Sequence, residues 1–118
     1  MTKTFGGYIR NRREELLKAS REFTVRKVAA KIDVQPSYLS KVERKEVAPP
    51  SEETIIRLAQ ALQEDPDLLL AMAGKISADL RKVILKRPKL FAELIRQLKY
   101  APDHALLRVV REVRDGSW

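Results

Sequence analysis

The sequence predicts an all-α fold, and two observations support this prediction. Apolar residues recur at intervals of three and four positions along almost the whole chain of 118 residues, which is the spacing of one face of an α-helix. A sustained alternation of apolar and polar residues, which would indicate half-buried strands, is absent from the sequence. We therefore expect a series of short helices and no sheet.

Five helices are expected in the first part of the chain, and several of them begin at a residue that suits a helix start. Thr24 and Ser51 each carry a hydroxyl that can accept a hydrogen bond from a free amide of the first turn. The fixed φ of Pro36 suits the first position of a helix, and Gly74 is a helix stop. The expected helices cover residues 5–19, 24–32, 36–45, 51–63 and 65–72.

The second and third of these segments have the features of a helix-turn-helix. Ala29 is a small residue where the two helices would cross, and Asp33 follows in the turn, where the backbone calls for a residue that tolerates a left-handed conformation. Apolar residues stand at the offsets that would pack the two helices together. They are Val28, Ile32, Val34, Leu39 and Val42.

The charge balance favours a polyanionic partner. The chain has 24 Lys and Arg residues against 16 Asp and Glu residues, a formal net charge of +8, which suits nucleic acid or an anionic membrane surface. Residues 1–50 contain 12 basic and 6 acidic side chains, and residues 51–118 contain 12 and 10, so most of the excess lies in the first half. The two halves are therefore expected to have different roles.

The composition argues against an enzyme. The chain has no Cys and one His, and it has neither a glycine-rich phosphate loop nor a metal-ligand spacing. No apolar run is long enough for a transmembrane helix, and the start of the sequence lacks the apolar stretch of a signal peptide. We expect a cytoplasmic protein with no catalytic residue, cofactor, metal or membrane partner.

The most specific pattern in the sequence is VQPSYLSKVER, residues 34–44. Together with IRNRREELLKAS in the first expected helix, this segment resembles the Cro/C1-type (Xre) helix-turn-helix family of transcriptional regulators. The resemblance covers roughly Phe5 to Gly74 and implies a five-helix, lambda-repressor-like DNA-binding domain over residues 1–74. In such a domain the third helix lies in the major groove of double-stranded DNA.

The resemblance also implies which residues contact DNA. Pro36, Ser37, Tyr38 and Lys41 match the positions that read base edges. Among them Lys41 suits guanine O6 or N7, and Ser37 suits several bases. The residues that match phosphate contacts are Thr24, Val25, Arg26, Lys27, Gln35, Arg44 and Lys45.

A second argument concerns four charged residues, of which two would contact phosphate and two would pair with each other. Arg26 and Lys27 stand in the first turn of their helix, where cations oppose the helix dipole, and bound phosphates would remove that penalty. Arg13 and Glu43 match two family positions that form a partly buried ion pair between the first and third helices. The resemblance therefore implies a structural role for this pair rather than a DNA contact.

The chain departs from the family pattern at four positions. Many members have Gln where this chain has Val25, Ser where it has Gln35, and Gly where it has Asp33 and Lys45. Loss of the Gln removes a bidentate contact with adenine or phosphate, so the operator sequence cannot be inferred from the resemblance. The buried apolar positions are unaffected.

Residues 75–118 are expected to form a C-terminal helical dimerisation segment. The pattern predicts helices over residues 77–86, 88–99 and 102–114, and these helices are rich in Leu, Ile and Val. So much apolar surface has to be buried, either on the first domain or against a second copy of the chain. We favour a homodimer through residues 76–113, because paired half-sites supply the specificity that a single recognition helix lacks.

These observations predict a sequence-specific regulator, a repressor, that binds a double-stranded DNA operator as a homodimer. Two alternatives stay open. An antitoxin-type autoregulator would bind a partner protein through its C-terminal helices and would copurify with that partner. A protein-binding adaptor that has lost DNA recognition would bind DNA weakly and without the salt dependence of phosphate contacts.

Overall fold

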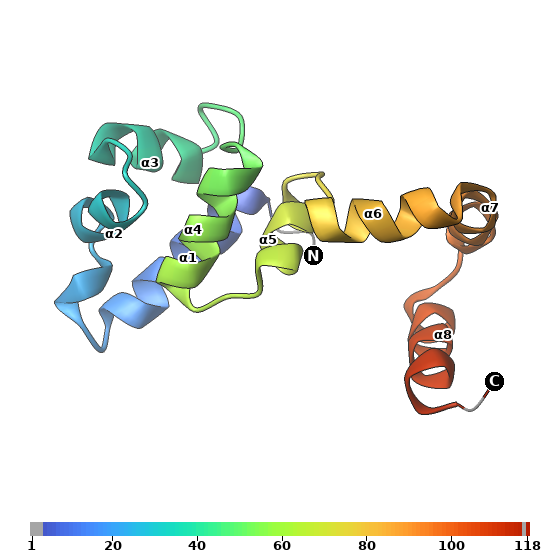
Figure 1. Ribbon diagram of the computed structural model, residues 1–118. Helices are drawn as coiled ribbons and strands as arrows, with labels where there is room; N and C mark the ends of the chain where they lie inside the picture. The colour runs from blue at the N-terminus through green and yellow to red at the C-terminus, as the bar shows by residue number, and fades with distance from the viewer. Residues whose placement is uncertain (1–3, 117) are drawn as a thin grey trace. The chain divides into compact units, whose positions relative to one another are not determined.

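The structure confirms the all-α prediction. It is a computed structural model that describes residues 4–116 and 118, and within these residues it contains eight α-helices, one short 3₁₀ helix and no strand (Figure 1). The elements are α1 (Phe5–Leu17), η1 (Arg21–Phe23), α2 (Val25–Lys31), α3 (Pro36–Glu43), α4 (Glu52–Leu62), α5 (Pro66–Met72), α6 (Ala78–Lys86), α7 (Pro88–Leu98) and α8 (Asp103–Asp115). The chain divides into two compact units, of which the first extends to Ser77 and the second begins at Ala78.

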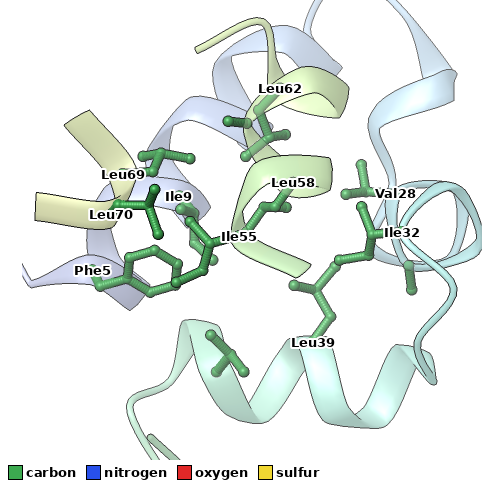
Figure 2. Close-up of a cluster of buried hydrophobic side chains, with 13 residues drawn as sticks. Phe5, Ile9, Val28, Ile32, Leu39, Ile55, Leu58, Leu62, Leu69 and Leu70 are labelled. Carbon is green, nitrogen blue, oxygen red and sulfur yellow. The ribbon is translucent and has the colours of Figure 1, made fainter. Parts of the chain in front are cut away.

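One hydrophobic core holds the first unit together, and all five of its α-helices contribute to it (Figure 2). Its buried apolar residues are Phe5, Ile9, Val28, Ala29, Ile32, Leu39, Val42, Ile55, Leu58, Ala59, Leu62, Leu69 and Leu70. Four of the five apolar residues predicted to pack the helix-turn-helix are in this set, and Val34 is half-buried against it. The apolar pattern of the sequence thus predicts the inner faces of α2 and α3.

Two arginines connect helices of the first unit through backbone carbonyls. Arg12 donates from Nε to the carbonyl oxygen of Leu62 at 3.0 Å, and Arg57 donates from Nη1 to the carbonyl oxygen of Ile32 at 3.2 Å. These carbonyls lie at the ends of α4 and α2, where a helix leaves its last acceptors without partners. Both guanidinium groups are therefore part of the scaffold.

Four helices of the first unit end in the same kind of turn. Just after each helix one residue has a positive φ, namely Asp33 (60°), Lys45 (65°), Gln63 (58°) and Gly74 (76°). The amide that follows this residue donates back to a carbonyl of the last helical turn, at distances of 2.8–3.0 Å. These turns explain why α2 and α3 end at Lys31 and Glu43, slightly before the predicted ends.

Glycine at position 63 is expected to stabilise the first unit. Gln63 has an exposed side chain and a φ of 58°. Left-handed backbone costs a non-glycine residue about 1–2 kcal/mol, and the freedom of glycine in the unfolded chain offsets about 0.4–1 kcal/mol of that gain. We expect Gln63→Gly to raise the free energy of unfolding, measured in urea, by about 0.5–1 kcal/mol.

Position 60 provides the control for this prediction. Gln60 is exposed inside α4, where its backbone is helical, so the same replacement by glycine there is expected to lower the free energy of unfolding by about 1 kcal/mol. A loss of stability in both variants would show that the backbone at Gln63 is not strained.

The second unit leaves most of its large apolar side chains exposed. None of the residues described in α6, α7 and α8 is buried. In α7, Leu90, Leu94 and Leu98 recur every fourth residue and so share one side of the helix. The large apolar residues of this unit that are exposed are Leu80, Val83, Leu85, Leu90, Leu94, Ile95, Tyr100, Leu106, Leu107, Val110, Val113 and Trp118.

The positive charge is divided between the two structural units differently from its division between the two halves of the sequence. Residues 1–77 contain 14 basic and 11 acidic side chains, whereas residues 78–118 contain 10 and 5. The basic excess of the first 50 residues is thus partly balanced within its own unit, by the acidic segment over residues 51–77. Both units carry a net positive charge.

Candidate nucleic-acid interface

Helices α2 and α3 meet as a helix-turn-helix. Ala29 is fully buried at the packed face of α2, where the sequence predicts a small residue. Asp33 in the turn has a φ of 60°, which is the left-handed conformation expected there. The amide of Val34 donates to the carbonyl oxygen of Ala29 at 3.0 Å, and this bond fixes the direction in which the chain enters α3.

Helix α3 has one buried edge and one exposed edge. Leu39, Val42 and Glu43 are buried, whereas Ser37 and Lys41 are exposed. Positions 37 and 41 are one helical turn apart, so their side chains follow each other along the outer edge. Neither side chain has a hydrogen bond or ion pair within residues 4–116 and 118, so both are available to a ligand.

The other predicted contacts at the start of α3 differ in exposure. Gln35 and Pro36 are exposed, and Tyr38 is half-buried against the core. Gln35 occupies the N-cap position of α3, but its side chain makes no capping hydrogen bond. Its amide is therefore available for an outside contact, whereas the ring of Tyr38 also has a packing role.

The start of α2 presents two exposed cations. The Thr24 hydroxyl oxygen accepts from the amide of Lys27 at 3.2 Å, so Thr24 is the N-cap, and its hydroxyl proton remains for another acceptor. Val25 is half-buried against the core and offers packing rather than a polar side chain. Arg26 and Lys27 are exposed, and the Lys27 ammonium lies 3.9 Å from the carboxylate of Glu22.

Beyond α3, a cation predicted to contact phosphate has a partner within the chain. Arg44 donates from Nε to a carboxylate oxygen of Glu46 at 2.5 Å, and both side chains are half-exposed. This hydrogen bond raises the pKa of Arg44 and lowers the pKa of Glu46, so both groups are charged at neutral pH. Lys45, between them, is exposed. No pattern in the sequence predicts the contact between Arg44 and Glu46.

Arg13 and Glu43 form a buried ion pair between α1 and α3. Arg13 donates from Nε and Nη2 to the two carboxylate oxygens of Glu43 at 2.6 and 2.9 Å, and from Nη1 to the carbonyl oxygen of Phe23 at 3.2 Å. Each residue is only 6% exposed. The bond to Glu43 raises the pKa of Arg13. The pair connects α1 to the buried edge of α3.

Gly6 sets the distance between α1 and the end of α3, a role that the sequence does not predict. A Cβ atom at Gly6 would lie 2.2 Å from the carbonyl oxygen of Val42 and 3.0 Å from that of Glu43. The two helices therefore meet backbone to backbone at this point. The contact positions the last turn of α3, from which Arg44 projects.

A helix-turn-helix whose second helix has an exposed outer edge with a basic side chain is typical of DNA-binding proteins. The chain belongs to the Cro/C1-type helix-turn-helix family, because the family model described as helix-turn-helix matches residues 9–69, more than half of the chain. It is a DNA-binding regulator of transcription, in a family that is typically not enzymatic. No curated protein and no solved structure matches the chain. Among the described helices, none is both long and apolar enough to cross a membrane.

Proposed function

We propose that the chain is a cytoplasmic repressor that binds a specific double-stranded DNA operator as a homodimer. The observation that carries this proposal is the division of α3 into an exposed edge, with Ser37 and Lys41, and a buried edge, with Leu39 and Val42. Such a helix can enter the major groove while its inner edge keeps its place in the domain. A dimer bound within a promoter would exclude the transcription machinery from that site.

The residues around α3 divide into two roles in this proposal. Ser37 and Lys41, with Pro36 and Tyr38 beside them, face base edges, and the Lys41 ammonium donates to guanine O6 or N7. The phosphate contacts come from the segments that flank this edge, which are the start of α2, the N-cap of α3 and the turn after α3. They are Thr24, Val25, Arg26, Lys27, Gln35, Arg44 and Lys45.

Two variants are expected to separate base reading from backbone binding. Lys41→Ala should reduce discrimination at one base pair by about 1–3 kcal/mol, because the side chain that reads it is lost. Arg26→Ala should weaken binding to all sequences equally and reduce the slope of log K against log salt by about one. Selection of bound sites from random DNA, followed by affinity measurements over a salt series, measures both effects.

Lys31 provides the matched control for these variants. It lies at the far end of α2, with its Nζ atom 5.0 Å from the centre of the Phe23 ring, so Lys31→Ala removes one positive charge outside the proposed surface. Its effect on DNA affinity should be small. An equal loss of base discrimination in the Lys41 and Arg26 variants would refute the division of roles.

The second unit supports the proposal of a homodimer through residues 76–113. Most of its large apolar side chains are exposed, and burial of about 1,200 Å² or more in total is typical of a specific interface. Leu94 lies on the apolar side of α7, so Leu94→Glu would place a charge in the proposed interface. Light scattering should show a dimer for the wild-type chain at tens of micromolar and a monomer for this variant.

The control for the dimer is Ala92→Glu. Ala92 is exposed on α7, and it lies two residues from both Leu90 and Leu94 and so on the side of the helix opposite the leucines, so the same new charge there should leave the dimer intact. A wild-type chain that is monomeric at this concentration would overturn the homodimer.

An antitoxin-type autoregulator is the second candidate, because the same uncovered apolar side chains suit a partner protein of another sequence. In that case the second unit would form a stable heteromeric complex, and the partner would copurify with the chain from its native cells. A homodimer without such a companion favours the repressor.

A further inference from the structure

We propose that Glu46 lowers the affinity of the chain for the DNA backbone by binding Arg44 when no DNA is present. This inference rests on the proposed function, in which Arg44 contacts a phosphate. The carboxylate of Glu46 occupies the place on the guanidinium that a phosphate oxygen would take, since the Nε of Arg44 donates to it at 2.5 Å. DNA therefore competes with Glu46 for Arg44.

The position of Glu46 is fixed by the turn that ends α3. Lys45 has a φ of 65°, its amide donates to the carbonyl oxygen of Val42 at 3.1 Å, and the amide of Glu46 donates to that of Lys41 at 2.9 Å. The turn folds the chain back along the last turn of the helix. The carboxylate is thus held beside the proposed reading edge by the backbone.

The charges around Glu46 explain how its carboxylate would weaken DNA binding. The hydrogen bond from Arg44 lowers the pKa of Glu46, and the nearby charges of Arg44 and Lys41 lower it further, so the group is an anion at neutral pH. When Arg44 turns to a phosphate, the carboxylate loses its partner and lies close to the DNA charge. It then attracts a cation from solution, which opposes the release of counterions that drives binding.

This effect is independent of the base sequence. Glu46 acts on a backbone contact, so it weakens binding to the operator and to other duplexes by the same factor, and the selection of the operator is left to the groove-facing residues. Weaker backbone binding shortens the time that the chain spends on the excess of non-operator DNA.

The test uses Glu46→Gln in the full chain, with operator and random-sequence duplexes titrated over a salt series. We expect about twofold to fivefold tighter binding to both duplexes, the range of an exposed ion pair. The slope of log K against log salt should steepen by up to about one for each bound subunit. In an Arg44→Gln background the replacement of Glu46 should have a smaller effect, because the competition is gone and only the repulsion between the carboxylate and the DNA backbone remains.

Glu15→Gln is the matched control. Glu15 lines a shallow pocket with Tyr8, Asn11, Arg12 and Glu64 on another side of α1, so this change removes one negative charge away from α3. Equal tightening by both variants would overturn the proposal, because it would show an effect of net charge alone. Unchanged affinity of the Glu46 variant would overturn it too, while leaving the proposed function intact. A wild-type chain that binds no duplex at low salt would refute the proposed function itself.

Discussion

Replacement of Arg13 with methionine is expected to lower the free energy of unfolding of the first unit by about 3–5 kcal/mol. The two side chains of the ion pair are 8% and 5% exposed, so the carboxylate of Glu43 would remain in the protein interior without a counterion. Methionine also cannot replace the bond to the carbonyl oxygen of Phe23. Urea unfolding at neutral pH measures the loss.

The double variant Arg13→Met/Glu43→Leu tests the cause of this loss. Two apolar side chains need no counterion and can pack, so the double variant should recover most of the stability that the single variant loses. If Arg13→Met lowered the free energy of unfolding by less than about 1 kcal/mol, the pair would behave as an exposed one. The burial seen between α1 and α3 would then not hold in solution.

The sequence predicts most of the helix-turn-helix because the signals for it are local. The spacing of apolar residues places Val28 and Leu39 in the core, and both are buried. A small residue at Ala29 and a left-handed residue at Asp33 are also found where the sequence predicts them. Each of these features depends on residues only a few positions away, so the sequence alone contains the information.

Features that depend on distant segments, or on the path of a turn, were not predicted. Gly6 lies against the carbonyl oxygens of α3, and no pattern near Gly6 indicates which backbone it will meet. Arg44 was predicted as a cation for phosphate, whereas the turn at Lys45 brings Glu46 back to it. The sequence does contain one signal for this turn, since many family members have glycine at the position where this chain has Lys45.

The sequence also does not determine the role of the second unit. The apolar spacing predicts three helices, and the structure contains α6, α7 and α8 in those regions. Periodicity shows that each helix has an apolar side, but it does not name the surface that covers this side. The described residues of this unit are unburied in the single chain, so the homodimer remains a prediction for solution experiments.

Replacement of Gly6 with alanine is expected to lower the free energy of unfolding by about 3 kcal/mol, the upper end of the range for overpacked sites. The new Cβ atom would lie 2.2 Å from the carbonyl oxygen of Val42, and a backbone atom cannot rotate away as a side chain can. Helix α1 and the end of α3 would have to separate, which would also disturb the bond between Arg13 and Glu43.

The adjacent glycine distinguishes this backbone contact from a general effect of alanine in α1. At Gly7 a Cβ atom would meet only the hydroxyl oxygen of Thr4, at 3.1 Å, and that side chain is exposed. Alanine is the better helix former by about 1 kcal/mol, so Gly7→Ala should leave the stability unchanged or slightly higher. Similar thermal unfolding of the two variants would mean that α1 and α3 do not meet at Gly6. Loss of stability at Gly6 alone would show that close approach of the two backbones holds the proposed reading helix in place.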